Sequence, residues 1–513
     1  MIQKQKWRKA NKQTMKTLFK LFVFIFLITV SVNLTAQENK FLQREFWNSN
    51  PSIAEIDALI TEGNDITERN AAFFDGPTYA ILQKVDPETI AYIISKEGNG
   101  VDKLTHDGRI YLHWAAYSGN KKVVDKLLAK GSDAAAIDAH GYSVVNFSAN
   151  AGLNDTTIYD ALLAKGADLN STTHNGANAL LLAASNGKDL GIINYLSSHG
   201  LKLSSTDNLG NGVFTYAARS GNISLLKTLK EKGVDYRLIN KEGENALFSA
   251  ARGTRRNQNG LAVFTYLEGL GLSNQILNTK GQNLLHLLAS RNKDVALFEH
   301  LINSGLDVNL ADSEGNTPFM LASQNNNLEI IKLLAQKVDK INTVNNKGQS
   351  ALHLATQDNS VDVIRFLVAQ GVNIKATDND GNSLALYWLE SYRPRDMKEF
   401  NQKKAFLAQS KVDFKASQHN DNTLIHLAAK ENNLKLLKQL EDFSIPINQK
   451  NNEGNTALHL AALSANNDEI LKYLISRGAD VSAKTDFEET VFDLASENEL
   501  LEKNQVELDF LKL

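Results

Sequence analysis

The chain has 513 residues, of which 42% are hydrophobic and 22% charged, a composition typical of folded domains rather than disordered segments. It contains no cysteine, which excludes disulfides, thiol nucleophiles and cysteine-ligated metals. Its formal charge is only −3, but the charges are unevenly distributed along the chain.

The first 36 residues have the pattern of an export signal. They carry seven Lys or Arg and no acidic residue, and include an apolar run from Leu21 to Val30 and a small residue, Ala36, at the cut. The run is shorter than the ~20 residues that a membrane-spanning helix needs, so we predict cleavage. The alternative is an uncleaved anchor facing the periplasm. Met15 offers a second possible start.

Cleavage would make the protein clearly acidic. Without residues 1–36 the chain has 48 basic and 58 acidic residues, a formal charge of −10. Such a charge repels phosphate backbones, so we expect no nucleic-acid partner. We also expect no stable membrane span after cleavage, because no later apolar stretch is long enough. These features predict a periplasmic or secreted protein.

After the first 40 residues one sequence word recurs. Its clearest copies are GNTALHLAA from Gly454, GQSALHLAT from Gly348 and GNTPFMLAS from Gly315. We call the first residue of each copy its anchor; the thirteen anchors are Gly76, Gly108, Gly141, Gly176, Gly210, Gly243, Gly281, Gly315, Gly348, Gly381, Asp421, Gly454 and Glu488. Most steps between anchors are 32 to 35 residues, and two are 38 and 40. A fixed period of this length predicts stacked units that share one core.

Each copy carries signals for two short helices. The position two residues after the anchor holds a side chain that can cap a helix in eleven copies. These residues are Thr78, Ser143, Asn178, Asn245, Asn283, Thr317, Ser350, Ser383, Thr423, Thr456 and Thr490. Ile110 is the one violation, since Gly212 is a tolerable cap. The position seven residues after the anchor is usually Ala, which lets helices approach closely; Gln83, Leu288 and Trp388 depart from this rule.

The end of the first helix is also marked. Gly or Asn stands there in several copies, and both tolerate left-handed backbone angles. These residues are Gly119, Gly187, Gly221, Asn326 and Asn432. A second helix follows, with paired apolar residues such as Leu127-Leu128 and Leu333-Leu334.

The word, its period and its capping position resemble the ankyrin repeat, and we interpret the chain as an exported ankyrin-repeat protein of bacterial type. The resemblance implies an all-α repeat solenoid of helix–turn–helix units joined by turn or hairpin loops, about 13 or 14 units in a curved, elongated array. We expect a signal peptide at 1–36, a partial capping repeat at 41–75, the array at 76–487 and a C-terminal capping repeat at 488–513. Residues Ile53 to Ile60 should form a helix of the first cap.

Nothing in the sequence indicates an enzyme. It contains no phosphate-binding loop, dinucleotide-binding, zinc-protease or serine-hydrolase motif. Five histidines share one repeat position, where the resemblance implies a structural hydrogen-bonding role: His113, His286, His353, His426 and His459. We therefore expect no catalytic activity, no cofactor and no metal.

A second group of histidines lies at the turn tips, just before the anchors: His106, His140, His174 and His419. Packed helices lie ~8–10 Å apart, so tips of successive repeats are poorly placed to share one metal ion. The group is either a polar contact stripe or exposed filler.

In the ankyrin family the partner usually meets the turn tips and the exposed side of the first helices. The matching residues nearest the N-terminus combine Tyr, His and Arg, which are typical of interaction hot spots. Our candidate partner-binding residues there are His106, Arg109, Tyr117, His140, Tyr142 and His174, with Arg219 and Arg252 further on. Later positions such as Gln324, Gln349 and Gln357 can be mere solvation.

The two long steps mark insertions, both placed between the first and second helices of a unit. One contains Arg255 and Arg256; the other contains Arg393 and Arg395 and precedes a Lys-rich helix. We hypothesise that these basic residues contact an acidic partner, and the alternative is a pair of tolerated, solubilising loops.

Together these features predict a monomeric scaffold for protein–protein interaction in the bacterial periplasm. The alternatives are a secreted or surface-exposed protein that binds a host or partner, and an accessory protein that supports a periplasmic enzyme. The sequence does not identify the partner protein.

Overall fold

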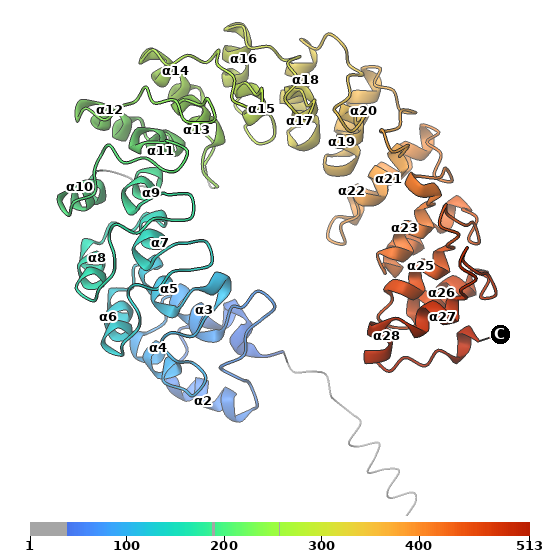
Figure 1. Ribbon diagram of the computed structural model, residues 1–513, viewed down its shortest axis with the longest axis horizontal. Helices are drawn as coiled ribbons and strands as arrows, with labels where there is room; N and C mark the ends of the chain where they lie inside the picture. Colours follow the sequence, from blue (N-terminus) through green and yellow to red (C-terminus); the bar gives the residue numbers. More distant parts are fainter. Residues whose placement is uncertain (1–37, 187–189, 256, 513) are drawn as a thin grey trace, which may run out of the picture. The chain divides into compact units, whose positions relative to one another are not determined.

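The computed structural model describes residues 38–186, 190–255 and 257–512. The predicted signal peptide, the helix stop at Gly187 and the candidate residue Arg256 lie outside these ranges. Within them the chain forms short helices in consecutive pairs, joined by hairpin loops that contain only isolated β-bridges and no strand (Figure 1). The chain divides into two compact units, unit 1 at Met1–Ala179 and unit 2 at Leu180–Leu513.

Unit 1 begins with two 3₁₀ turns and a single helix, followed by three helix pairs. The turns are η1 (Lys40–Leu42) and η2 (Arg44–Ser49). The helices are α2 (Ile53–Thr61), α3 (Gly76–Leu82), α4 (Pro87–Ile94), α5 (Tyr111–Tyr117), α6 (Lys121–Ala129), α7 (Val144–Asn150) and α8 (Thr156–Leu163). Phe41 and Trp47 of the turns are fully buried, and the Trp47 indole donates to the Phe41 carbonyl at 3.0 Å. The turns therefore cover the apolar face of the first pair, and α2 forms where the sequence predicts a helix.

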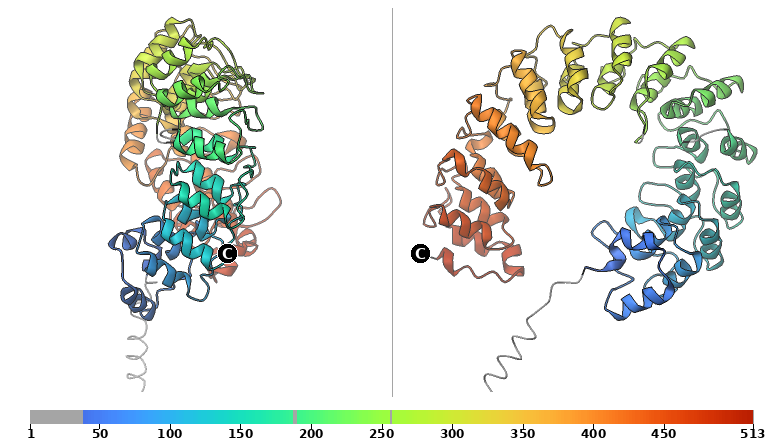
Figure 2. Two further views of the ribbon diagram at one scale, coloured as in Figure 1. Left: turned by 90° about the vertical axis from the view of Figure 1, so that its left-hand side faces the viewer. Right: turned by 180° about the vertical axis from the view of Figure 1, so that it is seen from behind.

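Unit 2 continues the same alternation of first and second helices. Its helices are α9 (Ala179–Asn186, which starts at the boundary), α10 (Gly191–Ser198), α11 (Val213–Ser220), α12 (Ile223–Glu231), α13 (Ala246–Arg252), α14 (Leu261–Gly269), α15 (Leu284–Ala289), α16 (Val295–Asn303), α17 (Pro318–Asn325), α18 (Leu328–Ala335), α19 (Ala351–Asp358), α20 (Val361–Ala369), α21 (Leu384–Glu390), α22 (Met397–Gln409), α23 (Leu424–Lys430), α24 (Leu434–Gln439), α25 (Ala457–Ser464), α26 (Glu469–Ser476), α27 (Val491–Ser496) and α28 (Glu499–Lys503). Within this unit the pairs follow one another in chain order in each view (Figure 2).

Every anchor from Gly108 to Glu488 adopts a left-handed backbone, with φ between 56° and 89°. Glycine pays no steric penalty there, which explains why it dominates this position. Asp421 and Glu488 take the same conformation without being glycine, so the sequence placed both anchors correctly. The cap two residues later is also confirmed in most copies; for example, the Thr456 hydroxyl accepts from the His459 N–H.

The anchor predicted at Gly76 is wrong. Gly76 is already the first residue of α3, and Asp75, not Thr78, caps the helix. The left-handed residue two positions before the cap Asp75 is Phe73, with φ of 63°, so Phe73 is the anchor of this repeat. Counted from Phe73, the position seven residues later is Ala80, which is small and fully buried. Gln83 departed from this rule only because the count began at Gly76.

The hairpin tips of neighbouring repeats are joined by backbone hydrogen bonds. The Ala139 N–H donates to the Asp107 carbonyl at 2.8 Å, and the Ser313 N–H donates to the Lys280 carbonyl at the same distance. Each bond joins the residue just before one anchor to the residue two positions before the next anchor. Successive tips are thus held closer together than the spacing of helix axes suggests.

Buried asparagines link the turns between helices in unit 2. The Asn326 side chain donates to the Ala289 and Asn292 carbonyls at 2.6 and 2.8 Å, and the Asn359 side chain donates to the Ser323 and Asn326 carbonyls. Gly119, Gly221 and Asn432 are left-handed as predicted, but Asn326 is extended, with φ of −97°. Asn326 therefore stabilises the turn through the hydrogen bonds of its side-chain amide, and not by adopting a left-handed backbone.

The two insertions lie between first and second helices, as predicted. They are the loops 253–260 and 391–396, and α22 extends to 13 residues. At Trp388, where the sequence breaks the small-residue rule, the indole stacks on Phe400 of α22 at 4.5 Å between ring centres. The longer helix therefore compensates for the larger side chain.

Candidate protein-binding surface

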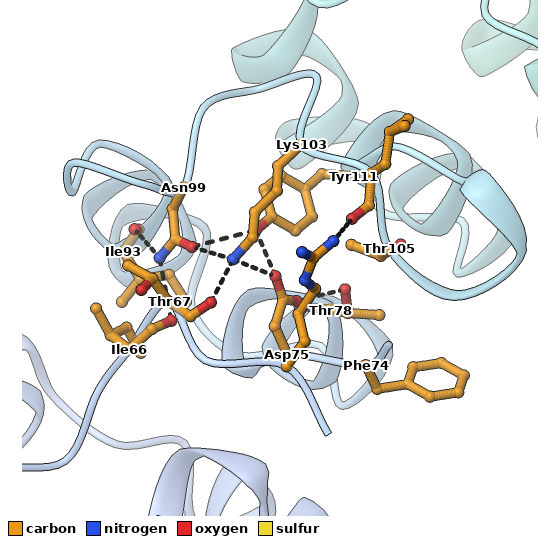
Figure 3. A network of polar contacts seen from close by, with 12 residues as sticks. Ile66, Thr67, Phe74, Asp75, Thr78, Ile93, Asn99, Lys103, Thr105 and Tyr111 are labelled. Atoms are coloured by element: carbon orange, nitrogen blue, oxygen red, sulfur yellow. Dashed lines mark hydrogen bonds and ion pairs between the residues drawn. The ribbon is translucent and has the colours of Figure 1, made fainter. Parts of the chain in front are cut away.

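A buried polar network fixes the first repeat of unit 1 against the second (Figure 3). The Asp75 carboxylate is fully buried and accepts from the Thr78 N–H and hydroxyl at 3.0 and 2.7 Å. Its other oxygen accepts from the Tyr111 hydroxyl at 2.7 Å and pairs with Lys103 at 3.0 Å. Burial, and then the neighbouring Asp75 charge, raise the pKa of Tyr111.

Lys103 ties this network to the preceding hairpin. Its ammonium group donates to the Thr67 carbonyl at 2.7 Å and to the Asn99 side chain at 2.8 Å. Asn99 in turn donates to the Ile66 and Ile93 carbonyls. A buried carboxylate with this many donors holds α3 and α5 in a fixed relation.

Aromatic rings form a continuous cluster on this rigid base. Phe74 stacks on His106 at 4.4 Å between ring centres and contacts Trp114 at 5.6 Å. Trp114 meets Phe147 edge-on at 5.6 Å, and Phe147 stacks on Tyr117 at 5.1 Å. The cluster spans three consecutive repeats of unit 1, and its members come from the hairpins and first helices.

Arg109 lies beneath the rings. Its guanidinium carbon is 4.2 Å from the Phe147 ring centre and 5.2 Å from that of Trp114. The same group donates to Asp138 at 2.8 Å and to Asp107 at 3.0 Å. Since Arg109 is only 7% exposed, it organises the cluster from inside.

Two tip histidines approach one carboxylate oxygen. His106 Nε2 and His140 Nε2 lie 3.3 and 3.4 Å from Asp107 Oδ2, although they come from successive repeats. The tips of successive repeats therefore come closer together than the spacing of helix axes suggests, because backbone hydrogen bonds join them. Among the described residues no group of three or more His, Cys, Asp or Glu could hold a metal ion.

The five histidines of the common repeat position are structural, as the resemblance implies. In the Gly454 copy, His459 Nδ1 accepts from the Thr456 N–H at 3.0 Å, and Nε2 lies 3.0 Å from the Ala483 carbonyl of the next hairpin. Burial lowers the pKa of all five, and that of His113 to about 4. These side chains are neutral links between repeats.

Models of known protein families match most of this architecture. A model of three ankyrin repeats matches residues 145–240, 180–267, 285–378 and 399–485, and a model of a single ankyrin repeat matches residues 107–139. These matches cover more than half of the chain. The chain belongs to the ankyrin-repeat family.

Curated relatives of this ankyrin-repeat chain carry different activities in their names. It is 30% identical over 161 residues to the palmitoyltransferase AKR1 of Lachancea kluyveri and 27% identical over 162 residues to the putative palmitoyltransferase ZDHHC13 of Danio rerio. It is 28% identical over 138 residues to an L-asparaginase of Dirofilaria immitis. Each match covers 27 to 31% of this chain and only 21 to 25% of the relative.

Ankyrin repeats are interaction modules without catalytic function, so the fold supports a protein-binding role at this coarse level. No helix in the described part of the chain is long and apolar enough to cross a membrane. The chain spans only about a quarter of the length of these relatives, so the matches do not show their named activities for this chain.

The ankyrin stack places the N-terminal candidate residues at different depths. Tyr117, His140 and His174 are exposed, while His106 and Tyr142 are half-buried. Arg109 was predicted as a contact residue but is buried, because two carboxylates and two rings enclose it. Sequence reasoning missed the rings that support the others, Phe74, Trp114 and Phe147. Their signal was aromatic residues recurring in the same three repeats.

The arginines of the middle ankyrin repeats are already paired. Arg252 forms a two-pronged ion pair with the buried Glu244, and Arg219 donates to the Gly253 carbonyl at 2.7 Å. Burial opposes ionisation of Glu244, but the bonds from Arg252 and Asn278 outweigh it and lower the pKa. These arginines hold the first insertion in place.

The second insertion is less basic at its surface than its sequence suggests. Arg393 donates to the Glu390 and Tyr392 carbonyls at 2.7 and 2.9 Å, so its charge caps the end of α21. Lys403 of the following helix is buried and donates to the Thr356 carbonyl at 2.9 Å. Arg255, Arg393 and Arg395 are all exposed, but the Arg393 guanidinium is engaged by the main-chain carbonyls.

The glutamines read as possible solvation instead bridge repeats of unit 2. Gln324 donates to Asp358, and Gln357 donates to Glu390, each at 2.9 Å. Gln349 donates to the Tyr387 hydroxyl at 3.1 Å. Each of these bonds needs a partner side chain from the next repeat, so the sequence of one repeat does not predict it.

Proposed function

We propose that this ankyrin-repeat protein is an exported scaffold that binds a protein partner through its N-terminal aromatic surface, defined as His106, Tyr117, His140 and Tyr142. The observation that carries the proposal is the ring cluster that runs across three repeats, with the exposed Tyr117 and His140 and the half-buried His106 and Tyr142 at its surface. Unit 2 has a second group of touching rings at the second insertion, but Trp388, Phe400 and Phe414 at its centre are buried and serve the packing of α22.

The surface has the properties of an interaction hot spot. Tyr and His combine an apolar ring with a polar tip, and Tyr is enriched where binding energy concentrates. The Asp75 network and Arg109 hold the underlying rings in place. Because this surface is already held in place, it loses little conformational entropy when a partner binds.

Export is the second part of the proposal. The basic and apolar pattern of residues 1–36 supports it, and the acidic charge of the remaining chain is compatible with a soluble exported protein. The periplasm is the compartment that we favour. A secreted or surface-exposed protein that binds a host partner, or an accessory protein for a periplasmic enzyme, would use the same surface.

The test is partner capture from living cells. The native gene, with a C-terminal tag, is expressed; cells are crosslinked and fractionated, and mass spectrometry identifies both the captured proteins and the N-terminus of the tagged chain. We expect a periplasmic fraction, an N-terminus near Gln37 and one dominant exported partner. Retention of Met1 in a cytoplasmic fraction would exclude export.

A matched pair of variants locates the surface. The double variant Tyr117→Ala/His140→Ala should reduce capture at least tenfold, because it removes the two exposed contact side chains and leaves the buried rings. Leu463→Ala/Glu453→Ala changes the same two repeat positions in the Gly454 copy and should leave capture unchanged. Equal capture by both variants would place the partner elsewhere on the stack.

A further inference from the structure

The second insertion opens a cleft between two ankyrin repeats of unit 2. The first helices α21 and α23 pack less closely than the first-helix pairs on either side of them. Loop 391–396 and the ends of the two helices border an open volume of about 520 Å³. The cleft lies where this six-residue loop replaces the shorter turn of the preceding repeat, residues 359–360.

The wall of the cleft is fixed rather than loose. The Tyr392 ring meets Phe400 edge-on, with 5.3 Å between ring centres. Phe400 is buried against Trp388, and Lys403 anchors α22 to the end of α19 through the Thr356 carbonyl. A preformed cleft avoids the ordering cost that a mobile loop would impose on binding.

The floor is apolar and comes from both repeats. Leu386 and Leu389 lie on α21, Leu427 lies on α23, and Leu436 lies on α24. Leu386 and Leu427 are only half-buried, so they offer apolar area to a ligand. Covering such area is favourable by ~25 cal/mol per Å².

The polar wall of the cleft contains the carboxylate of Glu390. One Glu390 oxygen accepts from Gln357 at 2.9 Å, and its other oxygen has no hydrogen-bond partner among the described residues. The Glu390 residue is exposed in the cleft, but partial burial of its carboxylate raises its pKa, and the charges of Asp358 and Asp378 raise it further. A cation placed beside this carboxylate would relieve that penalty.

The cations that line the cleft form no ion pair with Glu390 within the described residues, although the nearby Arg393 charge lowers its pKa. The Arg393 guanidinium is turned toward the main-chain carbonyls at the end of α21, and its nearest carboxylate is Asp358 at 3.9 Å. Lys430 is exposed on α23 and forms no ion pair within the described residues. Glu431, next to it, adds a second acidic group.

From this juxtaposition we infer that the insertion cleft is a docking site for a protein segment that pairs apolar side chains with a lysine or arginine. The apolar side chains cover Leu386 and Leu427, and the cation bonds to Glu390. This inference reverses the sequence-based hypothesis of an acidic partner at this insertion. It rests on the proposed scaffold function but uses a different surface.

A displayed random dodecapeptide library, selected against the folded full-length chain, tests the inference. We expect enriched peptides that carry Lys or Arg within a few residues of large apolar side chains. Their affinity, measured by fluorescence anisotropy, should fall at least tenfold in Glu390→Gln and in Leu386→Ala, and should weaken as NaCl is raised.

Glu497→Gln is the matched control, because Glu497 occupies the same repeat position as Glu390 in the last repeat and is exposed outside the cleft. It should bind the peptides like the wild-type chain. Failure to enrich any peptide, enrichment without basic residues, or unchanged binding by Glu390→Gln would overturn the inference. Partner capture through Tyr117 and His140 would stand in each of those cases, so the two proposals fail separately.

Discussion

The Gly108 and Gly454 repeats contain the same word but hold its histidine differently. In the Gly454 repeat both nitrogens of His459 have partners, and Thr456 supplies the cap. In the Gly108 repeat Ile110 replaces the capping hydroxyl, and the buried Nδ1 of His113 has no partner. His113 keeps only a 3.3 Å contact with the Tyr142 carbonyl.

The difference shows how the N-terminal repeats are stabilised. They lack the local cap of the Gly108 helix and instead have a buried ionic network around Asp75 and a cluster of rings around Arg109. The C-terminal repeats depend on short-range caps that recur with the period. Candidate binding residues are concentrated where the regular cap is lost. The predictions below test this contrast.

The largest effect should come from removing the centre of the ionic network. Asp75→Ala leaves the half-buried Lys103 without its carboxylate partner and removes the cap of α3, so we expect unit 1 to lose about 3–5 kcal/mol of stability. Hydrogen exchange with mass spectrometry would show faster exchange in α3 and α5. Asp125→Ala removes an exposed pair with Lys121 and should cost less than about 1 kcal/mol. Equal costs would contradict a stabilising network.

Acid should destabilise the stack through its buried histidines. Their folded pKa values are lowered, so the unfolded chain binds more protons, and stability is lost as pH falls from ~6.5 through the folded values. For His113, with a folded pKa of about 4, the loss is about 3 kcal/mol. Chemical denaturation between pH 7 and 4 measures it. His113→Leu should flatten the slope for unit 1, and an unchanged slope would count against this role.

Truncating the two histidines compares the caps directly. His459→Ala leaves the Thr456 N–H and the Ala483 carbonyl without their partner, and should cost about 2–3 kcal/mol. His113→Ala removes one long contact and a desolvated nitrogen, so we expect a cost about 1 kcal/mol smaller. Urea unfolding followed by local hydrogen exchange gives both values. A larger loss for His113 would reverse the comparison.

The smallest effect should come from restoring the missing cap. Ile110→Thr gives His113 Nδ1 a hydroxyl partner, worth about 1 kcal/mol, but removes buried apolar atoms at a similar cost. The net change should be below about 1 kcal/mol. The informative quantity is the coupling free energy between the two positions. In the Ile110→Thr background, His113→Ala should cost more stability than it does in the wild-type chain. Strict additivity of the two changes would show that no cap had formed.

The sequence gives a correct account of features that depend on neighbours along the chain. The period, the caps from Ser143 to Thr490, the structural histidines and the position of both insertions follow from local spacing. The left-handed conformations at Asp421 and Glu488 follow in the same way. The predicted domain boundaries, export and monomeric state stay predictions.

The sequence could not place residues whose environment is supplied by another repeat. Phe73 acts as an anchor although it is not glycine, and His106 Nδ1 of the next repeat lies 2.8 Å from the Ala72 carbonyl beside it. Arg109 is buried by groups at residues 107, 138 and 147. Arg393 is turned toward the carbonyls at a helix end and forms no ion pair with the neighbouring Glu390 within the described residues.

By itself, then, the sequence determined the repeat, its helices and their caps, because short-range sterics and hydrogen bonds choose the backbone at each position of the word. Only the tertiary structure decided which polar and aromatic side chains are buried and which are free to meet a partner. That outcome depends on desolvation and packing between residues about one period apart, and no local pattern records it.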